Sequence, residues 1–344
     1  MNEISIVGLD IAKNVFQLHG VDEGGQIVLR RQLRRSEVLK FFGKQKPCLV
    51  GLEACAGAHY WARAITALGH DVRLMPPSLV KPYVKRGSKS DAADAAACCE
   101  AVTRPAMRFV PVKSVEQQAA LMLHRARQLL VEQRTQLSNA IRAHMAEVGI
   151  VAAKGESGFD ALLAMLGNPH DTRAPQALRP ILGVLVEQWR GAGAQIEAID
   201  RQIAAWHKGN AESLRLATIP QIGPVIASAA VATAGDATRF RNGRQFAAWL
   251  GLVPSKTGTG GKIKLGPITK AGDRYLRQLL VIAGAGLIRR VRKDPSLNPW
   301  LADILARMPA KQAAVAMANK LARTIWALLA TGATYQADRL KAHS

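Results

Sequence analysis

The sequence has few cysteines, no long apolar run and no signal-peptide pattern in its first residues. Its four cysteines, at positions 48, 55, 98 and 99, form no CxxC pair, and too few histidines accompany them for a zinc module. We therefore expect reduced thiols in a cytosolic protein. No run of about 18 uncharged apolar residues is present, so a membrane-spanning helix is not expected. The first residues, MNEISIVGL, lack the basic start and apolar stretch of a signal peptide.

Acidic residues are also scarce compared with basic ones. The 344 residues include 47 Lys and Arg but 25 Asp and Glu, which gives a net charge of +22. Because 49% of the residues are hydrophobic, the chain can form real cores, and a disordered basic tail is excluded. A folded chain of this charge favours a polyanionic partner, with nucleic acid ahead of an anionic membrane surface. Residues 215–294 hold 14 Lys and Arg against three Asp and Glu, so half of the surplus lies there.

The hydrophobic pattern predicts three domains. Short apolar strands alternate with helices up to residue 114, which indicates an α/β domain. Residues 115–214 read as two long helices around a loop, and a heptad seam from Leu185 to Trp206 favours an antiparallel coiled-coil arm over an ordinary helical hairpin. Residues 215–344 are predicted to be mainly helical around a glycine-rich loop. Within them IPQIGPVIA, residues 219–227, is typical of a helix-hairpin-helix element or of a plain packing turn.

Four acidic residues stand out against the basic background. Asp10 and Glu53 each end an apolar strand, and Asp91 and Asp94 share one face of a predicted helix. Taken singly, each reads as a solvated strand end or a helix cap. Together they would repel one another unless cations lay between them, and carboxylates suit Mg²⁺ or Mn²⁺. A pair of such ions can activate an attacking oxygen and stabilise a leaving one at phosphorus.

Basic and hydroxyl side chains mark a second candidate site. The loop at residues 255–277 carries Ser255, Thr257 and Thr259 among glycines and lysines, without a Walker pattern. Taken alone, this composition favours a phosphate-binding loop over a covalent nucleophile. The nucleic-acid-binding candidates comprise three cations before the Asp91 helix and seven in the C-terminal region: Lys85, Arg86, Lys89, Arg239, Arg241, Arg244, Lys262, Lys264, Lys270 and Arg274.

These segments together resemble the DEDD transposases of bacterial insertion sequences, which join a RuvC-like domain of the RNase H fold to a serine-bearing transposase domain. The matching segments are VGLD (7–10), GLEACAGAHYWA (51–62), KSDAADA (89–95), RFVPVKS (108–114), IPQIGP (219–224) and GRQFAAWLGLVP through ITKAGDRYLR (243–277). The resemblance implies that Asp10, Glu53, Asp91 and Asp94 form a metal-binding catalytic tetrad, with two Mg²⁺ or Mn²⁺ ions. The family's catalytic serine corresponds to Thr259 here, a departure that keeps the hydroxyl but adds a hindering methyl group. Either Thr259 is the nucleophile, or Ser255 substitutes for it, or strand cleavage is weakened.

The resemblance further implies a DNA transposase of the bacterial cytoplasm, associated with the nucleoid. Its partners would be the element ends, the target DNA and a structured guide RNA. A homo-oligomer, dimer or tetramer, is expected because the two predicted sites lie in different domains. Two other functions stay open: a RuvC-like junction nuclease that uses activated water, and a non-catalytic nucleic-acid-binding remnant of a mobile element.

Overall fold

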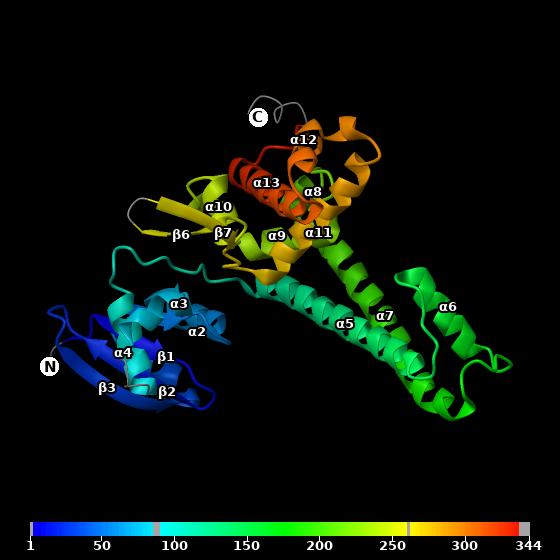
Figure 1. Ribbon diagram of the computed structural model, residues 1–344. Coiled ribbons are helices and arrows are strands. Elements are labelled where there is room, and N and C mark those ends of the chain that lie inside the picture. The colour runs from blue at the N-terminus through cyan, green and yellow to red at the C-terminus, as the bar shows by residue number, and fades with distance from the viewer. Residues whose placement is uncertain (1–2, 85–89, 260–261, 337–344) are drawn as a thin grey trace. The chain divides into compact units, whose positions relative to one another are not determined.

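The computed structural model describes residues 3–84, 90–259 and 262–336. The chain forms two compact units, residues 1–115 and 116–344, and each is described by itself (Figure 1). The first is built around a β-sheet, and the second is mostly helical. Both features agree with the predicted α/β N-terminal domain and helical remainder. The division of the second unit into an arm and a C-terminal domain stays a prediction.

The first unit contains a mixed five-stranded sheet in the order β3-β2-β1-β4-β5. Parallel pairing joins β1 to β4 and β4 to β5, whereas β2 pairs antiparallel with both β1 and β3. Apolar residues in the middle of β1 and β4 are fully buried, as expected for strands covered on both faces. The strands are β1 Ile6–Asp10, β2 Val15–Val21, β3 Ile27–Arg34, β4 Leu49–Glu53 and β5 Asp71–Met75.

Helices of the first unit follow the strands closely along the chain. They are α1 Val38–Phe42, α2 Ala58–Thr66, α3 Pro77–Val80 and α4 Asp91–Ala101. The buried ring of Trp61 on α2 packs edge-on against Phe16 of β2, with ring centroids 4.9 Å apart. α4 packs against β1, β2 and β4. Its small residues bury against the sheet and leave its N-terminal turn at the sheet edge.

Two long helices dominate the start of the second unit. They are α5 Val115–Ala146 and α7 Arg179–Lys208, and they run side by side (Figure 1). The Nε of Arg127 lies 2.5 Å from a carboxylate oxygen of Asp200, and the Arg134 guanidinium lies 4.1 Å from the ring centre of Trp189. The structure thus pairs the two predicted helices, while a coiled coil in the strict sense stays a prediction.

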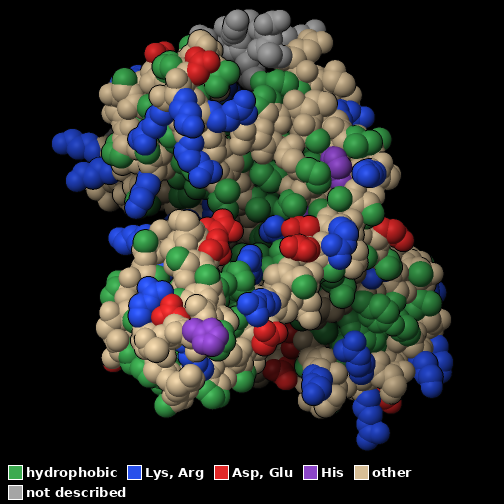
Figure 2. Space-filling model, turned by 90° about the vertical axis from the view of Figure 1, so that its right-hand side faces the viewer, with side chains coloured by type: hydrophobic (Ala, Val, Ile, Leu, Met, Phe, Trp, Pro, Cys, Tyr) green, Lys and Arg blue, Asp and Glu red, His purple; other side chains and the backbone are tan. Residues whose placement is uncertain are grey.

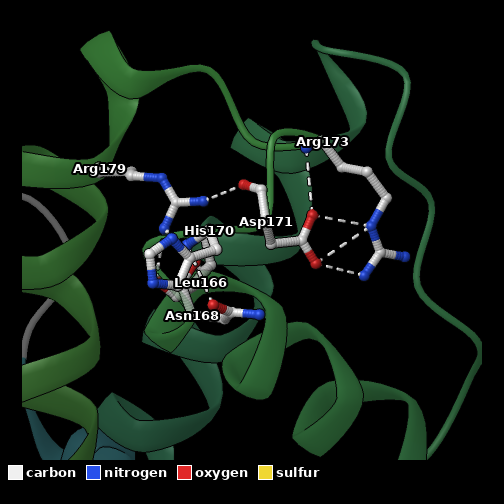
Figure 3. Close-up of polar contacts among 6 residues, drawn as sticks. All are labelled: Leu166, Asn168, His170, Asp171, Arg173 and Arg179. Atoms are coloured by element: carbon white, nitrogen blue, oxygen red, sulfur yellow. Dashed lines mark hydrogen bonds and ion pairs between the residues drawn. The ribbon is translucent and has the colours of Figure 1, made fainter.

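The far end of this helix pair is closed by a third helix and an ordered turn. Helix α6 Glu156–Gly167 buries Phe159 and Leu162 in a separate small core with residues of α5 and α7. Figure 3 shows the guanidinium of Arg179 pointing at backbone carbonyls of the turn that precedes it. Its Nη1 donates to the carbonyls of Leu166 and Asn168, both at 3.0 Å, and its Nη2 donates to that of Asp171. One side chain therefore fixes the turn between α6 and α7.

The remaining helices pack into the largest core of the chain. Helices α11 and α13 pack closely against each other, and Leu280, Ala318 and Leu321 between them are almost fully buried. The elements are α8 Ala211–Leu216, α9 Pro224–Ala234, α10 Gly243–Trp249, β6 Pro254–Thr259, β7 Lys262–Ile268, α11 Arg274–Val291, α12 Pro299–Arg307 and α13 Ala310–Thr331. No helix among the described residues is long and apolar enough to cross a membrane.

The glycine-rich segment differs from its prediction. The sequence predicts a loop over residues 255–277, whereas β6 and β7 form an antiparallel hairpin within it. The K-I-K-L alternation of β7 is a strand pattern, which the density of glycines hid. The predicted helix-hairpin-helix element stays a prediction, but Gln221 in it has a left-handed backbone with φ of 71°. Glycine adopts that conformation at lower cost than glutamine.

Candidate active site

The four predicted acidic residues occupy one edge of the sheet. Asp10 is the last residue of β1, and Glu53 is the last residue of β4. The two strands are parallel neighbours with Leu9 opposite Leu52, so these carboxylates follow at the same edge. Asp91 and Asp94 lie in the first turn of α4, which Ser90 caps by accepting a hydrogen bond from the Ala93 N–H at 3.2 Å. Helix and strands thus bring the acidic side chains to one place.

A pair of glycines lets α4 lie directly on the sheet. Gly8 of β1 and Gly51 of β4 are opposite each other in the parallel register. A Cβ on Gly8 would fall 2.0 Å from the carbonyl oxygen of Ala95 and 2.3 Å from the nitrogen of Cys99. A Cβ on Gly51 would fall 2.8 Å from another α4 carbonyl oxygen. Only hydrogen fits at these positions, and this close approach carries Asp91 and Asp94 to the strand ends.

We expect Gly8→Ala to lower the free energy of unfolding by about 3 kcal/mol or more, because an added methyl group meets backbone rather than a movable side chain. Gly24→Ala is the matched control, since the nearest atom to its added Cβ, an Asp22 carboxylate oxygen, would be 3.4 Å away. Urea denaturation of both variants measures the difference. Equal stability of the two variants would show that α4 does not depend on this contact.

The pKa values of Asp10 and Glu53 are shifted by burial and by neighbouring carboxylates. The pKa of Asp10 is raised from 3.8 to about 6, first by burial and then by repulsion from Asp94, Asp91 and Glu53 in that order of importance. Burial first, and then Asp94, also raise the pKa of Glu53. Such mutual repulsion is unfavourable in the folded chain without a cation. The edge of the sheet is therefore a strongly negative place in a strongly basic protein.

The donor set suits a hard divalent cation. Carboxylate oxygens are the ligands that Mg²⁺ and Mn²⁺ prefer, and repulsion between carboxylates contributes, after burial, to the raised pKa values of Asp10 and Glu53. Within the described ranges, however, no three His, Cys, Asp or Glu side chains lie in a ready-made coordination arrangement. A cation held here would draw the side chains of Asp10, Glu53, Asp91 and Asp94 closer together than the structure has them.

This charge predicts a pH-dependent stability. The folded chain binds the Asp10 proton more tightly than the unfolded chain, so the free energy of unfolding falls as pH rises from about 4 to about 6. The expected loss is about 1 kcal/mol, well below the full shift because Asp10 is half-exposed. Asp10→Asn removes this loss, and millimolar Mg²⁺ restores stability in the original chain above pH 6. Urea denaturation at pH 4 and pH 7, with EDTA or Mg²⁺, checks both effects. An unchanged pH dependence in Asp10→Asn would assign it to another group.

The second candidate site lies on the β6–β7 hairpin. Thr257 pairs with Lys264 and Thr259 with Lys262, so two hydroxyls and two ammonium groups share one face. Both threonines and both lysines are exposed. Cations beside an exposed hydroxyl suit a phosphate, either as a bound group or as the centre of a reaction. The face joins the predicted nucleophile to two of the predicted nucleic-acid contacts.

The two candidate nucleophiles differ in accessibility. Thr259 is the last residue of β6 and is exposed. Ser255 is half-buried, and its Oγ lies only 2.6 Å from the place where a Cβ on Gly266 would be, so it is folded over the opposite strand. A phosphodiester therefore reaches the hydroxyl of Thr259 more freely than that of Ser255.

The other predicted nucleic-acid contacts have different environments. Most are exposed around the hairpin and the helix starts beside it: Arg241, Arg244, Lys262, Lys264, Lys270 and Arg274. Arg239 is half-buried instead, with its guanidinium 4.5 Å from the ring centre of Phe240 and 5.1 Å from that of Trp249. Lys85, Arg86 and Lys89 lie outside the described residues. Figure 2 shows Lys and Arg side chains gathered over the C-terminal helices, at the top of the view, with few carboxylates among them.

Comparison with known proteins matches both the N-terminal and the C-terminal part of the chain to one group. A transposase family model, the DEDD transposase of IS110 type, matches residues 7–150, and the IS116/IS110/IS902 transposase family model matches residues 213–299. A "Probable family 20 transposase" of Pseudomonas aeruginosa is 48% identical over 97% of this chain and 99% of its own length. The chain belongs to the IS110/IS116/IS902 transposase family. This confirms the family that the sequence motifs indicated.

Other members of the transposase family are similar over nearly the whole chain. The transposase for insertion sequence element IS1328 of Yersinia enterocolitica is 36% identical over 97% of this chain and 99% of its own length. The transposase for insertion sequence element IS1111A of Coxiella burnetii is also 36% identical, over 98% of this chain and 92% of its own length. The family model at residues 7–150 spans all four acidic residues, whereas the model at residues 213–299 spans both candidate nucleophiles.

The sequence does not reveal a buried polar cluster that joins α5, α9 and α11 in this transposase. The Nε2 of His124 on α5 lies 3.0 Å from the Ser228 hydroxyl, and its Nδ1 lies 3.2 Å from the Tyr275 hydroxyl at the start of α11. Burial first, and then Arg127, lower the pKa of His124 to about 4, so the imidazole is neutral at pH 7. A histidine on a helix face carries no signal of such a distant partner.

Proposed function

We propose that this transposase cleaves and rejoins DNA with the acidic tetrad and the hydroxyl of Thr259. The observation that carries the proposal is the convergence of Asp10, Glu53, Asp91 and Asp94 at one sheet edge in a member of a transposase family. Four mutually repelling carboxylates are costly in a fold unless a bound cation offsets their charge. The remnant hypothesis gives no reason for that cost.

The tetrad residues would hold Mg²⁺ or Mn²⁺, which supplies Lewis-acid stabilisation of the oxygens at phosphorus. Asp10 and Glu53 would contribute oxygens from the strand ends, and Asp91 and Asp94 from the first turn of α4. Because α4 lies on the backbone of Gly8 and Gly51, its two carboxylates are held by a rigid contact. Such rigid placement suits carboxylates that must keep a metal ion in position during the reaction.

The hydroxyl of Thr259 would attack a DNA phosphorus. A bond forms between its Oγ1 and phosphorus, the bond to one deoxyribose oxygen breaks, and the threonine proton passes to that leaving oxygen. The product is a phosphothreonyl ester and a free DNA hydroxyl. A hydroxyl of the partner DNA then attacks the same phosphorus, restores a phosphodiester and releases Thr259 with its proton. Lys262 and Lys264 on the same hairpin face would neutralise phosphate charge in both steps.

The basic surface would hold the nucleic acids. The exposed cations of the hairpin and of the starts of α10 and α11 suit the backbone of the element ends and the target DNA. The net charge of +22 also suits a structured guide RNA from the element, and we include that RNA in the proposal. A homo-oligomer, dimer or tetramer, would hold two DNA ends for exchange.

Product analysis tests this proposal. Purified protein is incubated with DNA that carries the element ends, with Mg²⁺ or EDTA, and with or without RNA transcribed from the element flanks. We expect rejoined recombinant DNA with Mg²⁺ and none with EDTA. Free hydrolysed ends without any joined product would contradict the proposal and favour the metal-dependent nuclease. Binding without cleavage at any metal concentration would favour the non-catalytic remnant.

A further inference from the structure

The second unit contains a large groove that has no part in the proposed chemical step. It has a volume of about 1930 Å³ and lies between the β6–β7 hairpin, the start of α10, and helices α12 and α13. Small-molecule sites enclose about 300–1,000 Å³, so this space suits a segment of a polymer. The α13 residues that line the groove lie outside residues 215–294, the stretch in which the basic surplus of the sequence is concentrated.

The charge of the groove is of one sign. Five cations line it: Arg244, Lys270, Lys311, Lys320 and Arg323. Its lining, as far as the chain is described, includes neither Asp nor Glu, and none of these cations forms an ion pair with a described carboxylate. The ammonium of Lys320 is held 4.1 Å from the ring centre of Trp300, and burial and Arg323 lower its pKa. Unpaired cations at fixed positions in a groove match an anion with several charges.

The groove is also apolar. Leu265 of β7 is 68% exposed and alternates away from the face that carries Thr259 and Lys262. Together with Pro254 and Trp300 it offers apolar surface between the cations. A nucleic-acid duplex stacks its bases inside and presents a charged backbone, whereas a single strand exposes base faces as well as phosphates. Apolar and cationic surface in one groove therefore matches an unpaired strand.

We propose that the groove between the β6–β7 hairpin and α13 binds a single-stranded segment of nucleic acid, with phosphates on Lys311, Lys320 and Arg323 and bases against Leu265. The proposal rests on the proposed function, because it gives the transposase a place for the strand that is unpaired during exchange. DNA and RNA offer the same phosphates and base faces, so the measurement compares the two.

Fluorescence anisotropy of the full chain with a labelled 20-nucleotide single-stranded DNA, the same sequence as RNA, and the DNA duplex tests the groove. The groove variant is Lys311→Glu with Arg323→Glu. The matched control is Arg289→Glu with Arg290→Glu, which changes the charge equally at two exposed positions outside the groove. We expect the groove variant to weaken single-strand binding about 100-fold. A plot of the logarithm of the binding constant against the logarithm of salt concentration should become less steep by about 1.4, the change for two lost phosphate contacts. The control should weaken it about threefold or less.

Leu265→Ser gives an independent test, because this exposed side chain can be changed without disturbing the core. We expect about tenfold weaker binding of the preferred single strand, at an unchanged salt slope, with duplex binding unaltered. Equal losses in the groove and control variants, or equal losses for duplex and single strand, would overturn the proposal. The tetrad lies in the other unit, so Asp91→Asn protein should bind the strand normally. Failure of the reaction with intact strand binding would therefore contradict the proposed function and leave the groove standing.

Discussion

Asp91→Asn is expected to lower transposition about 1,000-fold or more, because loss of one carboxylate from a metal-binding set removes several kcal/mol of transition-state stabilisation. The exchange keeps the shape of the side chain and its place in the first turn of α4. It also removes one of the charges that raise the pKa of Asp10. The folded protein should therefore be at least as stable as the original chain in EDTA. A plasmid-based transposition assay, with protein levels measured in parallel, gives the result.

Asp71→Asn is the matched control for this change. Asp71 is an exposed carboxylate at the start of β5, opposite Leu49. It therefore lies at the end of the parallel strands opposite to Asp10 and Glu53. The same chemical substitution there should leave transposition within about twofold of the original level, as surface changes away from a site usually do. Transposition at the original level in Asp91→Asn would show that the acidic set is not catalytic. A comparable loss in Asp71→Asn would show that the assay reports folding.

Thr259→Ala is expected to abolish strand joining, with a loss of about 1,000-fold or more, because no other atom of that side chain can form the phosphate ester. Thr259→Ser keeps the hydroxyl and removes the hindering methyl group, so it should retain or raise the activity. Binding of DNA should change little in either variant, since Lys262 and Lys264 remain on the hairpin face. In vitro recombination of element-end DNA, normalised to the amount of bound DNA, measures both.

Ser255→Ala distinguishes the two hydroxyls. Because Ser255 is half-buried and its Oγ is folded over Gly266, its loss should lower activity about threefold or less, the size of a modest packing change. The opposite pattern, with a severe loss in Ser255→Ala and a mild one in Thr259→Ala, would make Ser255 the nucleophile. Severe loss in both variants with normal DNA binding would mean that the hairpin acts as a unit.

The acidic edge of the first unit could be predicted from the sequence because its signals are local. An apolar strand that ends on an acid places the carboxylate at a sheet edge, and the spacing of Asp91 and Asp94 places both on one helix face. The closeness of helix and sheet could not be predicted in the same way. It depends on Gly8 meeting the backbone near Ala95, a contact between residues far apart in the chain.

The hairpin and the groove could not be predicted from local sequence signals. Glycines among lysines favour a loop by composition, and only cross-strand pairs such as Thr257 with Lys264 define a hairpin. The groove gathers Leu265 from the hairpin, Trp300 from α12 and Lys311 from α13. None of these residues has a neighbour in sequence that marks it as part of a site. The buried pairing of His124 with Ser228 is hidden for the same reason.

Mapping the covalent protein–DNA link tests the central claim most directly. The protein is incubated with element-end DNA, Mg²⁺ and element-derived RNA, the reaction is stopped with denaturant, and the digested adduct is sequenced by mass spectrometry. The account predicts an adduct that needs Mg²⁺, that is absent in Asp91→Asn, and whose nucleotide is attached to Thr259. Cleaved DNA with a free phosphate end and no attached peptide would contradict it, because water would then be the nucleophile.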